Sequence, residues 1–152
     1  MKEYCKPTLK DAVYLAEHLN QADKREMLAG VGKHILRDMV SGMQNSAEIG
    51  CCRFDGEPVA IYGIRKDSPL ADYGRVWLFL GEIKEEDRYY VARQSKRFVR
   101  AALERYSYIY NYVDVGNDKI IKWLEFLGAE FYGPEEYGFY GNKHYRFEIR
   151  RK

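Results

Sequence analysis

The chain has 152 residues, with 25 lysines and arginines against 23 aspartates and glutamates, which gives a formal net charge of +2. A charge so close to neutral excludes any argument from the overall field for binding nucleic acid or a membrane surface. A chain of this length can bury a core of its own, so we expect residues 1–152 to form one domain.

The three cysteines, Cys5, Cys51 and Cys52, make a poor disulfide framework because their number is odd and two are adjacent. No apolar segment reaches the roughly 20 residues that span a bilayer. The first residues, MKEYCKPTLKDA, lack the apolar core of a signal peptide. We therefore expect a protein of the cytoplasm with no membrane association. His18, His34 and His144 are scattered and none has ligand spacing with a cysteine, so we expect no metal site.

The first third of the sequence reads as a short strand followed by helices. Residues 2–7 can form an edge strand that ends at the proline. Thr8 and Asp11 resemble a capping box. The helix they open carries one apolar face, made of Leu9, Ala12, Val13, Ala16 and Leu19.

A second helix start is indicated at Asp23 and Glu26, and Gly30 and Gly32 interrupt it. A further helix is expected to stop near Gly42, and its apolar residues are Ile35, Leu36, Met39 and Val40.

The middle of the chain has the pattern of a sheet. Residues 47–54 and 57–65 flank Asp55-Gly56, a dipeptide typical of tight β-hairpins. Residues 75–81, with the sequence RVWLFLG, form a continuous apolar run, as expected of a central strand.

The longest helix is expected over residues 85–106, followed by a strand over 108–115. The next helix begins at Asn117 and stops at Gly128, a suitable C-terminal glycine.

Two closing strands, 129–132 and 143–150, are expected to pair across a glycine- and tyrosine-rich loop at 133–142. The expected order is β-α-α-β-β-β-α-β-α-β-β, an α/β fold of the α+β type. We expect a mixed sheet with one parallel crossover and helices on both faces.

That order resembles the GNAT family of acetyl-CoA-dependent N-acyltransferases. The family has a valine-containing strand, then an asparagine, then Leu-Gly-Phe about eleven residues after the asparagine. Val113, Asn117, Leu127 and Gly128 fall on those positions. Within 111–131 the pattern NYVxVGN more closely resembles the small GNAT-like internal virion proteins of short-tailed bacteriophages. The resemblance implies a phage or prophage source.

The GNAT resemblance implies a glycine-rich turn that holds the CoA pyrophosphate, followed by the long helix. Residues 86–91 occupy that place with the sequence EDRYYV, which contains no glycine and, with Glu85, carries three acidic groups. If acetyl-CoA or CoA binds nonetheless, the resemblance implies contacts from the central strand, the long helix and the next helix start. These contacts would come from Leu78, Leu80, Arg93, Lys96, Arg97 and Asn117.

Catalysis in the family uses an acid for the leaving thiolate, often a tyrosine seven residues after the asparagine. Leu124 occupies that position and has no proton to donate. Tyr132, Tyr137 or Tyr140 could replace it from the next segment. Candidates for the base that accepts the amine proton are Glu48 and Glu82.

Each of these residues also has a plainer interpretation. Asn117 is a suitable helix N-cap. The basic stripe Arg93, Lys96, Arg97 and Arg100 can be a solvated face, with Arg100 paired to Glu104 one turn on. It can instead supply charges for phosphates, or contact nucleic acid or an acidic partner. No nucleic-acid motif accompanies the stripe, so we do not expect nucleic-acid binding.

Two functions remain open, of which the residues favour the first, and a host-directed phage effector that modifies or blocks a bacterial protein would fit either. The first is a phage GNAT-like protein without catalysis that acts in virion assembly or binds a phage or host protein. The second is an active acetyl-CoA-dependent N-acetyltransferase with a remodelled cofactor loop. The 14 tyrosines suit sheet faces and interfaces, so a homodimer is compatible with either function.

Overall fold

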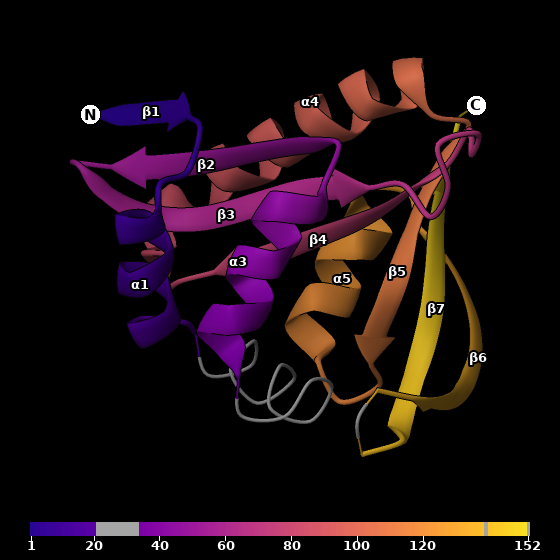
Figure 1. Ribbon diagram of the computed structural model, residues 1–152. Coiled ribbons are helices and arrows are strands. Elements are labelled where there is room, and N and C mark those ends of the chain that lie inside the picture. Colours follow the sequence, from indigo (N-terminus) through magenta and orange to yellow (C-terminus); the bar gives the residue numbers. More distant parts are fainter. Residues whose placement is uncertain (21–33, 139, 152) are drawn as a thin grey trace. The chain divides into compact units, whose positions relative to one another are not determined.

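The computed structural model describes residues 1–20, 34–138 and 140–151 (Figure 1). The helix start expected at Asp23 and Glu26, with its interruption at Gly30 and Gly32, lies outside the described residues. No helix in the described ranges is long and apolar enough to cross a membrane.

The described elements confirm the expected order and the mixed sheet. The strands hydrogen-bond in the order β1-β2-β3-β4-β5-β7-β6. The elements are β1 (Lys2–Cys5), α1 (Leu9–Glu17), α3 (Ile35–Asn45), β2 (Glu48–Phe54), β3 (Glu57–Arg65), β4 (Gly74–Leu80), a 3₁₀ turn η1 (Glu85–Asp87), α4 (Arg88–Arg105), β5 (Tyr108–Asp114), α5 (Asp118–Phe126), β6 (Glu130–Tyr137) and β7 (Asn142–Arg150).

The chain divides into two compact units. Unit 1 contains residues 1–65 and 76–83, and unit 2 contains residues 66–75 and 84–152. Whether the 152 residues act as one domain stays a prediction.

Unit 1 is built on the hairpin that the sequence indicated. Asp55 and Gly56 have φ angles of 53° and 85°, the positive values that a tight hairpin turn requires between β2 and β3. β1 is an edge strand that pairs antiparallel with β2, with Cys5 opposite Cys51. All three cysteines are free.

The capping box of α1 is confirmed. The Thr8 hydroxyl accepts a hydrogen bond from the Asp11 backbone N–H at 3.2 Å, and the Asp11 carboxylate accepts one from the Thr8 N–H at 2.8 Å. The same carboxylate receives two further bonds from Arg53 of β2, at 3.0 and 2.6 Å. One side chain therefore both caps the helix and ties it to the sheet.

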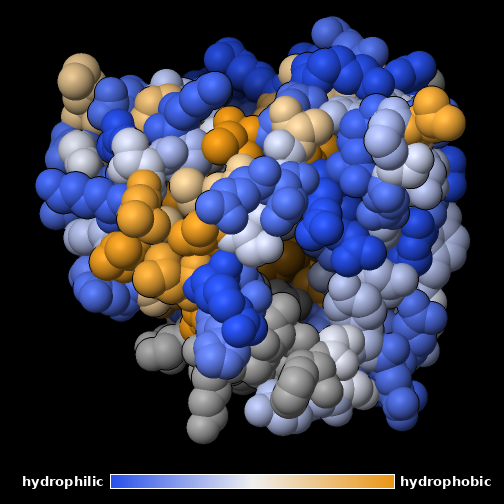
Figure 2. All heavy atoms as spheres, viewed as in Figure 1, coloured by the Kyte–Doolittle hydropathy of each residue, from blue (hydrophilic) through white to orange (hydrophobic). Residues whose placement is uncertain are grey.

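The core of unit 1 lies between its helices and the hairpin. Figure 1 shows α1 and α3 side by side on one face of β2 and β3. Leu15 from α1, Met39 from α3 and Ile61 from β3 are fully buried there. Figure 2 shows hydrophobic side chains gathered on the outer side of these helices. Val13 of α1 and Leu36 of α3 are both exposed.

The expected end of α3 near Gly42 is wrong, because the helix continues to Asn45. A Cβ atom at Gly42 would meet the Trp77 ring at 3.4 Å, an ordinary van der Waals distance, so the indole lies directly against this turn of the helix. The Trp77 indole N–H also donates to the Ser46 hydroxyl at 2.7 Å. This packing, rather than local helix propensity, explains why the helix continues past the glycine.

Unit 2 contains the parallel pair. Its ladder joins Gly74 to Ile109 and Arg75 to Tyr110 at the start of β4 and β5. On its other edge β5 pairs antiparallel with β7 along its whole length, and β7 pairs with β6 (Figure 1). Val99 and Ala102 of α4 and Leu124 of α5 are buried in this unit, as are Ile109, Val113, Phe147 and Ile149.

Most of the loop expected at 133–142 is strand. β6 continues to Tyr137, with a register shift between Tyr132 and Glu135 that accommodates Gly133 and Pro134. Pairing with β7 and stacking of the Tyr137 ring on Tyr112, at 3.9 Å between centroids, hold the extension in place. Long-range pairing outweighs the local turn signals here.

Candidate functional site

The turn before α4 is where the GNAT resemblance places the cofactor phosphates. Glu85–Asp87 form a single 3₁₀ turn, and the Glu85 carboxylate pairs with Arg88 at 3.2 Å. Tyr89 in the first turn of α4 is 73% exposed. A helix N-terminus attracts phosphate through free N–H groups and its positive dipole end, and three carboxylates at that end oppose such binding. The residues present do not fit a CoA pyrophosphate.

Asn117 acts as a helix cap. It is 2% exposed, and its side-chain oxygen accepts from the Ile120 N–H at 3.5 Å, at the start of α5. Gly128 ends the helix region with a φ of 92°, as the sequence indicated. Leu124 is 5% exposed and belongs to the core of unit 2, so the position of the family's acid is filled by a packing residue.

The candidates in unit 1 lie on β2 and β4 or just after β4. Glu48 begins β2 opposite Ile64, and Glu82 is exposed just after β4. Leu78 is half-buried on β4. The Leu80 carbonyl accepts both the backbone N–H and the side-chain amide of Asn20, at 3.1 and 2.7 Å.

In unit 2 the candidates Arg93, Arg97 and Tyr132 are exposed, whereas Asn117 is buried. Arg93 lies over the Tyr89 ring at 5.3 Å, and Arg97 projects from the same helix. Tyr132, on β6, donates its hydroxyl to Glu130 at 3.0 Å, and this bond raises the pKa of the tyrosine. Of the candidate residues, Lys96 lines the groove described next.

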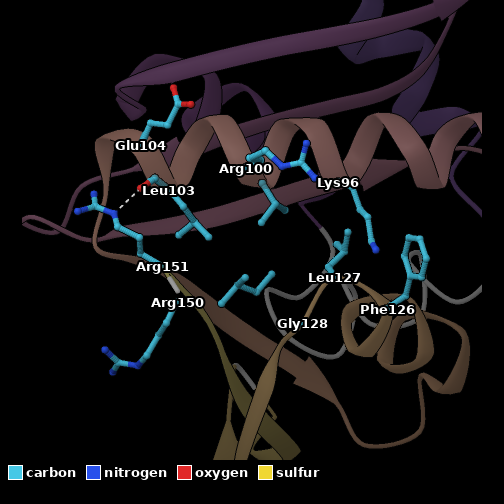
Figure 3. Close-up of a pocket in the computed structure, with 11 residues that line it drawn as sticks. Lys96, Arg100, Leu103, Glu104, Phe126, Leu127, Gly128, Arg150 and Arg151 are labelled. Atoms are coloured by element: carbon cyan, nitrogen blue, oxygen red, sulfur yellow. Dashed lines mark hydrogen bonds between the residues drawn. The ribbon is translucent and has the colours of Figure 1, made fainter.

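A groove of about 610 Å³ opens between the second half of α4, the C-terminal end of α5 and the end of β7 (Figure 3). Val99 and Ile149 are buried at its floor, and Leu103 and Leu127 are half-buried beside them. Phe126 also lines the groove and is 48% exposed. The lining is therefore largely apolar at its base.

Cationic side chains surround this base. The Lys96 ammonium lies 4.3 Å from the centroid of the Phe126 ring. Arg151 donates to the carbonyls of Leu103 at 2.6 Å and Tyr106 at 3.1 Å, so it caps the end of α4. Figure 3 shows Arg150 turned away from the groove.

The expected pairing of Arg100 with Glu104 is not formed. Within the described part of the chain no ion pair joins the two residues, and Figure 3 shows their side chains pointing in different directions from α4. Arg100 therefore lies at the groove without neutralisation by Glu104.

A second polar cluster joins side chains of β4, β5 and β6. The Arg75 guanidinium donates to the Tyr110 hydroxyl at 3.2 and 3.1 Å and to the Tyr137 hydroxyl at 3.1 Å. Tyr110 in turn donates to Asp67, and burial together with this bond raises the pKa of the tyrosine. The groups satisfy one another, which is typical of a structural network.

Glu148 is the centre of a neighbouring ion-pair set. It is 6% exposed and accepts from Arg146 and Arg150. Burial alone would raise the pKa of this carboxyl, but the bonds from the two guanidinium groups lower it overall. Glu148 is thus ionised and fully engaged, which makes it unsuitable as a catalytic base.

We expect Tyr110→Phe to lower the free energy of unfolding by about 1–2 kcal/mol, since Arg75 and Asp67 lose a buried partner. Urea denaturation measures the change. Tyr145→Phe is the matched control, because the Tyr145 hydroxyl has no hydrogen bond within the described ranges. Equal effects of the two variants would show that the Tyr110 network contributes nothing to stability.

Comparison with protein families supplies the decisive observation. The profile described as "Bacteriophage T7, probable scaffold protein Gp13" matches residues 58–138, more than half of the chain. The chain belongs to this family. It is a phage protein with a GNAT-like fold, as the resemblance of residues 111–131 implied.

Solved acetyltransferases share the fold of this phage family member. A ribosomal-protein-alanine N-acetyltransferase from Brucella melitensis superposes with a TM-score of 0.72 at 14% identity, over 98% of this chain and 99% of its own. An N-acetyltransferase from Staphylococcus aureus Mu50 gives 0.74 at 12% identity, over 99% and 98%. Spermidine N-acetyltransferase from Vibrio cholerae, solved with CoA and spermine, gives 0.73 at 11% identity, over 98% and 95%. Identities this low establish the fold alone.

Comparison with curated protein sequences gives no significant match.

The groove is the feature of the site that the sequence did not predict. Lys96, Val99, Arg100 and Leu103 recur at helical spacing on α4, which was a usable signal. Nothing local indicated that Phe126 and Ile149 would complete the same surface.

Proposed function

We propose that this phage protein does not use acetyl-CoA and acts by binding a phage or host protein during virion assembly, in the cytoplasm of the infected or lysogenic cell. The observation that carries the proposal is the turn before α4. Three acidic residues and no glycine stand where the fold's cofactor phosphates would bind. Loss of that site removes the basis for CoA-dependent chemistry while leaving the fold intact.

Two further features of the structure support the proposal. Leu124 fills the position of the acid with a buried hydrocarbon side chain. The Leu80 carbonyl on β4, a candidate cofactor contact, already accepts two hydrogen bonds from Asn20. The family's description as a probable scaffold protein favours a role in assembly.

An active acetyltransferase is the second candidate, and the shared fold with the acetyltransferases is the observation that favours it. In that case Arg93, Lys96 and Arg97 would replace the glycine-rich turn as point charges for phosphates. Glu48 or Glu82 would accept the amine proton, and Tyr132 would protonate the thiolate. A homodimer fits either candidate.

Complementation of a phage that lacks the gene separates the two candidates. We expect the deletion to lower the yield of infectious particles and the wild-type chain to restore it. The variants Glu48→Gln, Glu82→Gln and Tyr132→Phe should restore it equally well, because they remove acid–base chemistry and little packing. A loss of roughly tenfold or more with any of them, in soluble and folded protein, would favour catalysis over partner binding.

A further inference from the structure

We infer that the groove between α4, the end of α5 and the end of β7 binds an acidic segment of a partner protein, and that this segment inserts a large hydrophobic side chain. The inference rests on the proposed function, because it names the surface and the chemistry of the partner. It concerns residues at the second half of α4, away from the turn that precedes this helix.

The apolar base of the groove is the reason to expect a hydrophobic side chain in the partner segment. Val99, Leu103 and Ile149 form an aliphatic surface, and the Phe126 ring stands beside it with nearly half of its area exposed. A volume of about 610 Å³ is within the range of pockets that hold ligands of several side chains' size. Insertion of one leucine, phenylalanine or tryptophan would cover this surface, as anchor residues do at protein interfaces.

The cationic rim of the groove is the reason to expect an acidic partner segment. Lys96, Arg100 and Arg151 supply three cations, and Glu104 is the single acidic side chain among the described lining residues. Arg100 forms no ion pair with Glu104, and among the described residues Lys96 contacts a ring rather than a carboxylate. Arg93 and Arg97 extend the positive charge along the same helix. Carboxylates on either side of an apolar anchor would complement this distribution.

The lining favours a peptide over nucleic acid. Single-stranded nucleic acid is held by cations together with several aromatic rings on which bases stack. Phe126 is the one aromatic residue among the described lining residues, and the others at the base are aliphatic. Aliphatic surface gains stability from a hydrocarbon side chain and gains little from a phosphate backbone.

Selection from a library of random short peptides on the immobilised wild-type protein tests the inference. We expect the selected sequences to be enriched in aspartate or glutamate around a leucine or an aromatic residue. Their affinity should fall with salt, because surface ion pairs are screened. Selected peptides without acidic enrichment, or an absence of selected peptides, would overturn the inference.

Variants of the groove test where the selected peptide binds. Arg100→Glu and Phe126→Ser should each weaken binding by roughly tenfold or more in a fluorescence anisotropy titration. Lys122→Glu is the matched control. The substitution changes the charge by the same amount as Arg100→Glu, and Lys122 lies exposed on α5 and does not line the groove. Equal loss with all three variants would place the peptide elsewhere.

A charge exchange makes the test independent of folding. A peptide whose carboxylates are replaced by lysine should bind Arg100→Glu better than it binds the wild type. No such reversal would contradict direct pairing with Arg100. Displacement of the peptide by single-stranded DNA, or assembly of the protein into a dimer that buries Phe126, would overturn the inference in favour of nucleic acid or a second copy.

The peptide and the cofactor experiments have separate readouts. Failure of peptide binding with no binding of CoA would overturn the groove assignment and leave the proposed function in place. Binding of acetyl-CoA would overturn the proposed function whatever the peptide does.

Discussion

Gly63→Ala is expected to lower the free energy of unfolding by about 3 kcal/mol. A Cβ atom at this position would lie 2.5 Å from Cζ2 of Trp77 and 2.7 Å from the Glu48 carbonyl oxygen. Neither atom can move aside freely. The carbonyl belongs to the backbone of β2, and the indole is fixed by its bond to Ser46 and its contact with Gly42. The glycine is therefore a packing requirement of unit 1.

Urea denaturation followed by circular dichroism measures this effect. Gly42→Ala is the matched control, because its Cβ would meet the same Trp77 ring at 3.4 Å, an ordinary contact distance. In a helix this change should be close to neutral or slightly stabilising. Wild-type stability in Gly63→Ala would show that Trp77 does not pack as the structure describes.

Asp11→Ala is expected to lower the free energy of unfolding by about 2 kcal/mol at neutral pH. The substitution removes the capping box of α1 and leaves Arg53 without its closest partner. The Asp11 side chain is 8% exposed and that of Arg53 is 21% exposed, so the effect lies between those of surface and fully buried pairs. An unchanged urea midpoint would contradict this role for the pair.

The same pair predicts a dependence on pH. The hydrogen bonds from Arg53 hold the pKa of Asp11 below its usual value of 3.8. A lowered pKa contributes stability that is present above the unfolded value and is lost as pH falls through the folded value. Below about pH 4 the wild type should therefore lose stability faster than Asp11→Asn. Parallel losses in the two proteins would show that Asp11 titrates normally.

The parts of the fold that the sequence predicted are those fixed by neighbouring residues. The Thr8–Asp11 box, the Asp55-Gly56 turn and the Asn117 cap each depend on a few adjacent side chains. These interactions are visible as short patterns, so the sequence alone was enough to predict them.

The features of the structure that could not be predicted from the sequence depend on contacts between residues far apart in the chain. Gly42 remains inside α3 because Trp77 packs on it, and β6 extends to Tyr137 because β7 pairs with it. The groove likewise combines Arg100, Phe126 and Ile149 from three elements. Local propensity carries no information about such contacts, and it indicated a loop or a helix end instead.

The sequence predicted how the candidate site differs from that of the GNAT family, but it did not predict which residues form a site in this chain. The absence of glycine near residues 86–91 and the leucine at position 124 could be read directly from the sequence, and the structure places an acidic turn and a buried side chain there. Roles for Glu48, Glu82, Tyr132 and the cations of α4 stay predictions, since they depend on a ligand.

Titration of the purified protein with acetyl-CoA and with CoA, by calorimetry and thermal shift, tests the central claim most directly. The Vibrio cholerae spermidine N-acetyltransferase, whose structure contains CoA, serves as the positive control. We predict no heat of binding and no shift of the unfolding temperature at millimolar ligand. Micromolar binding would contradict the account, and a ligand at 100 times its Kd would then stabilise the fold by about 2.7 kcal/mol.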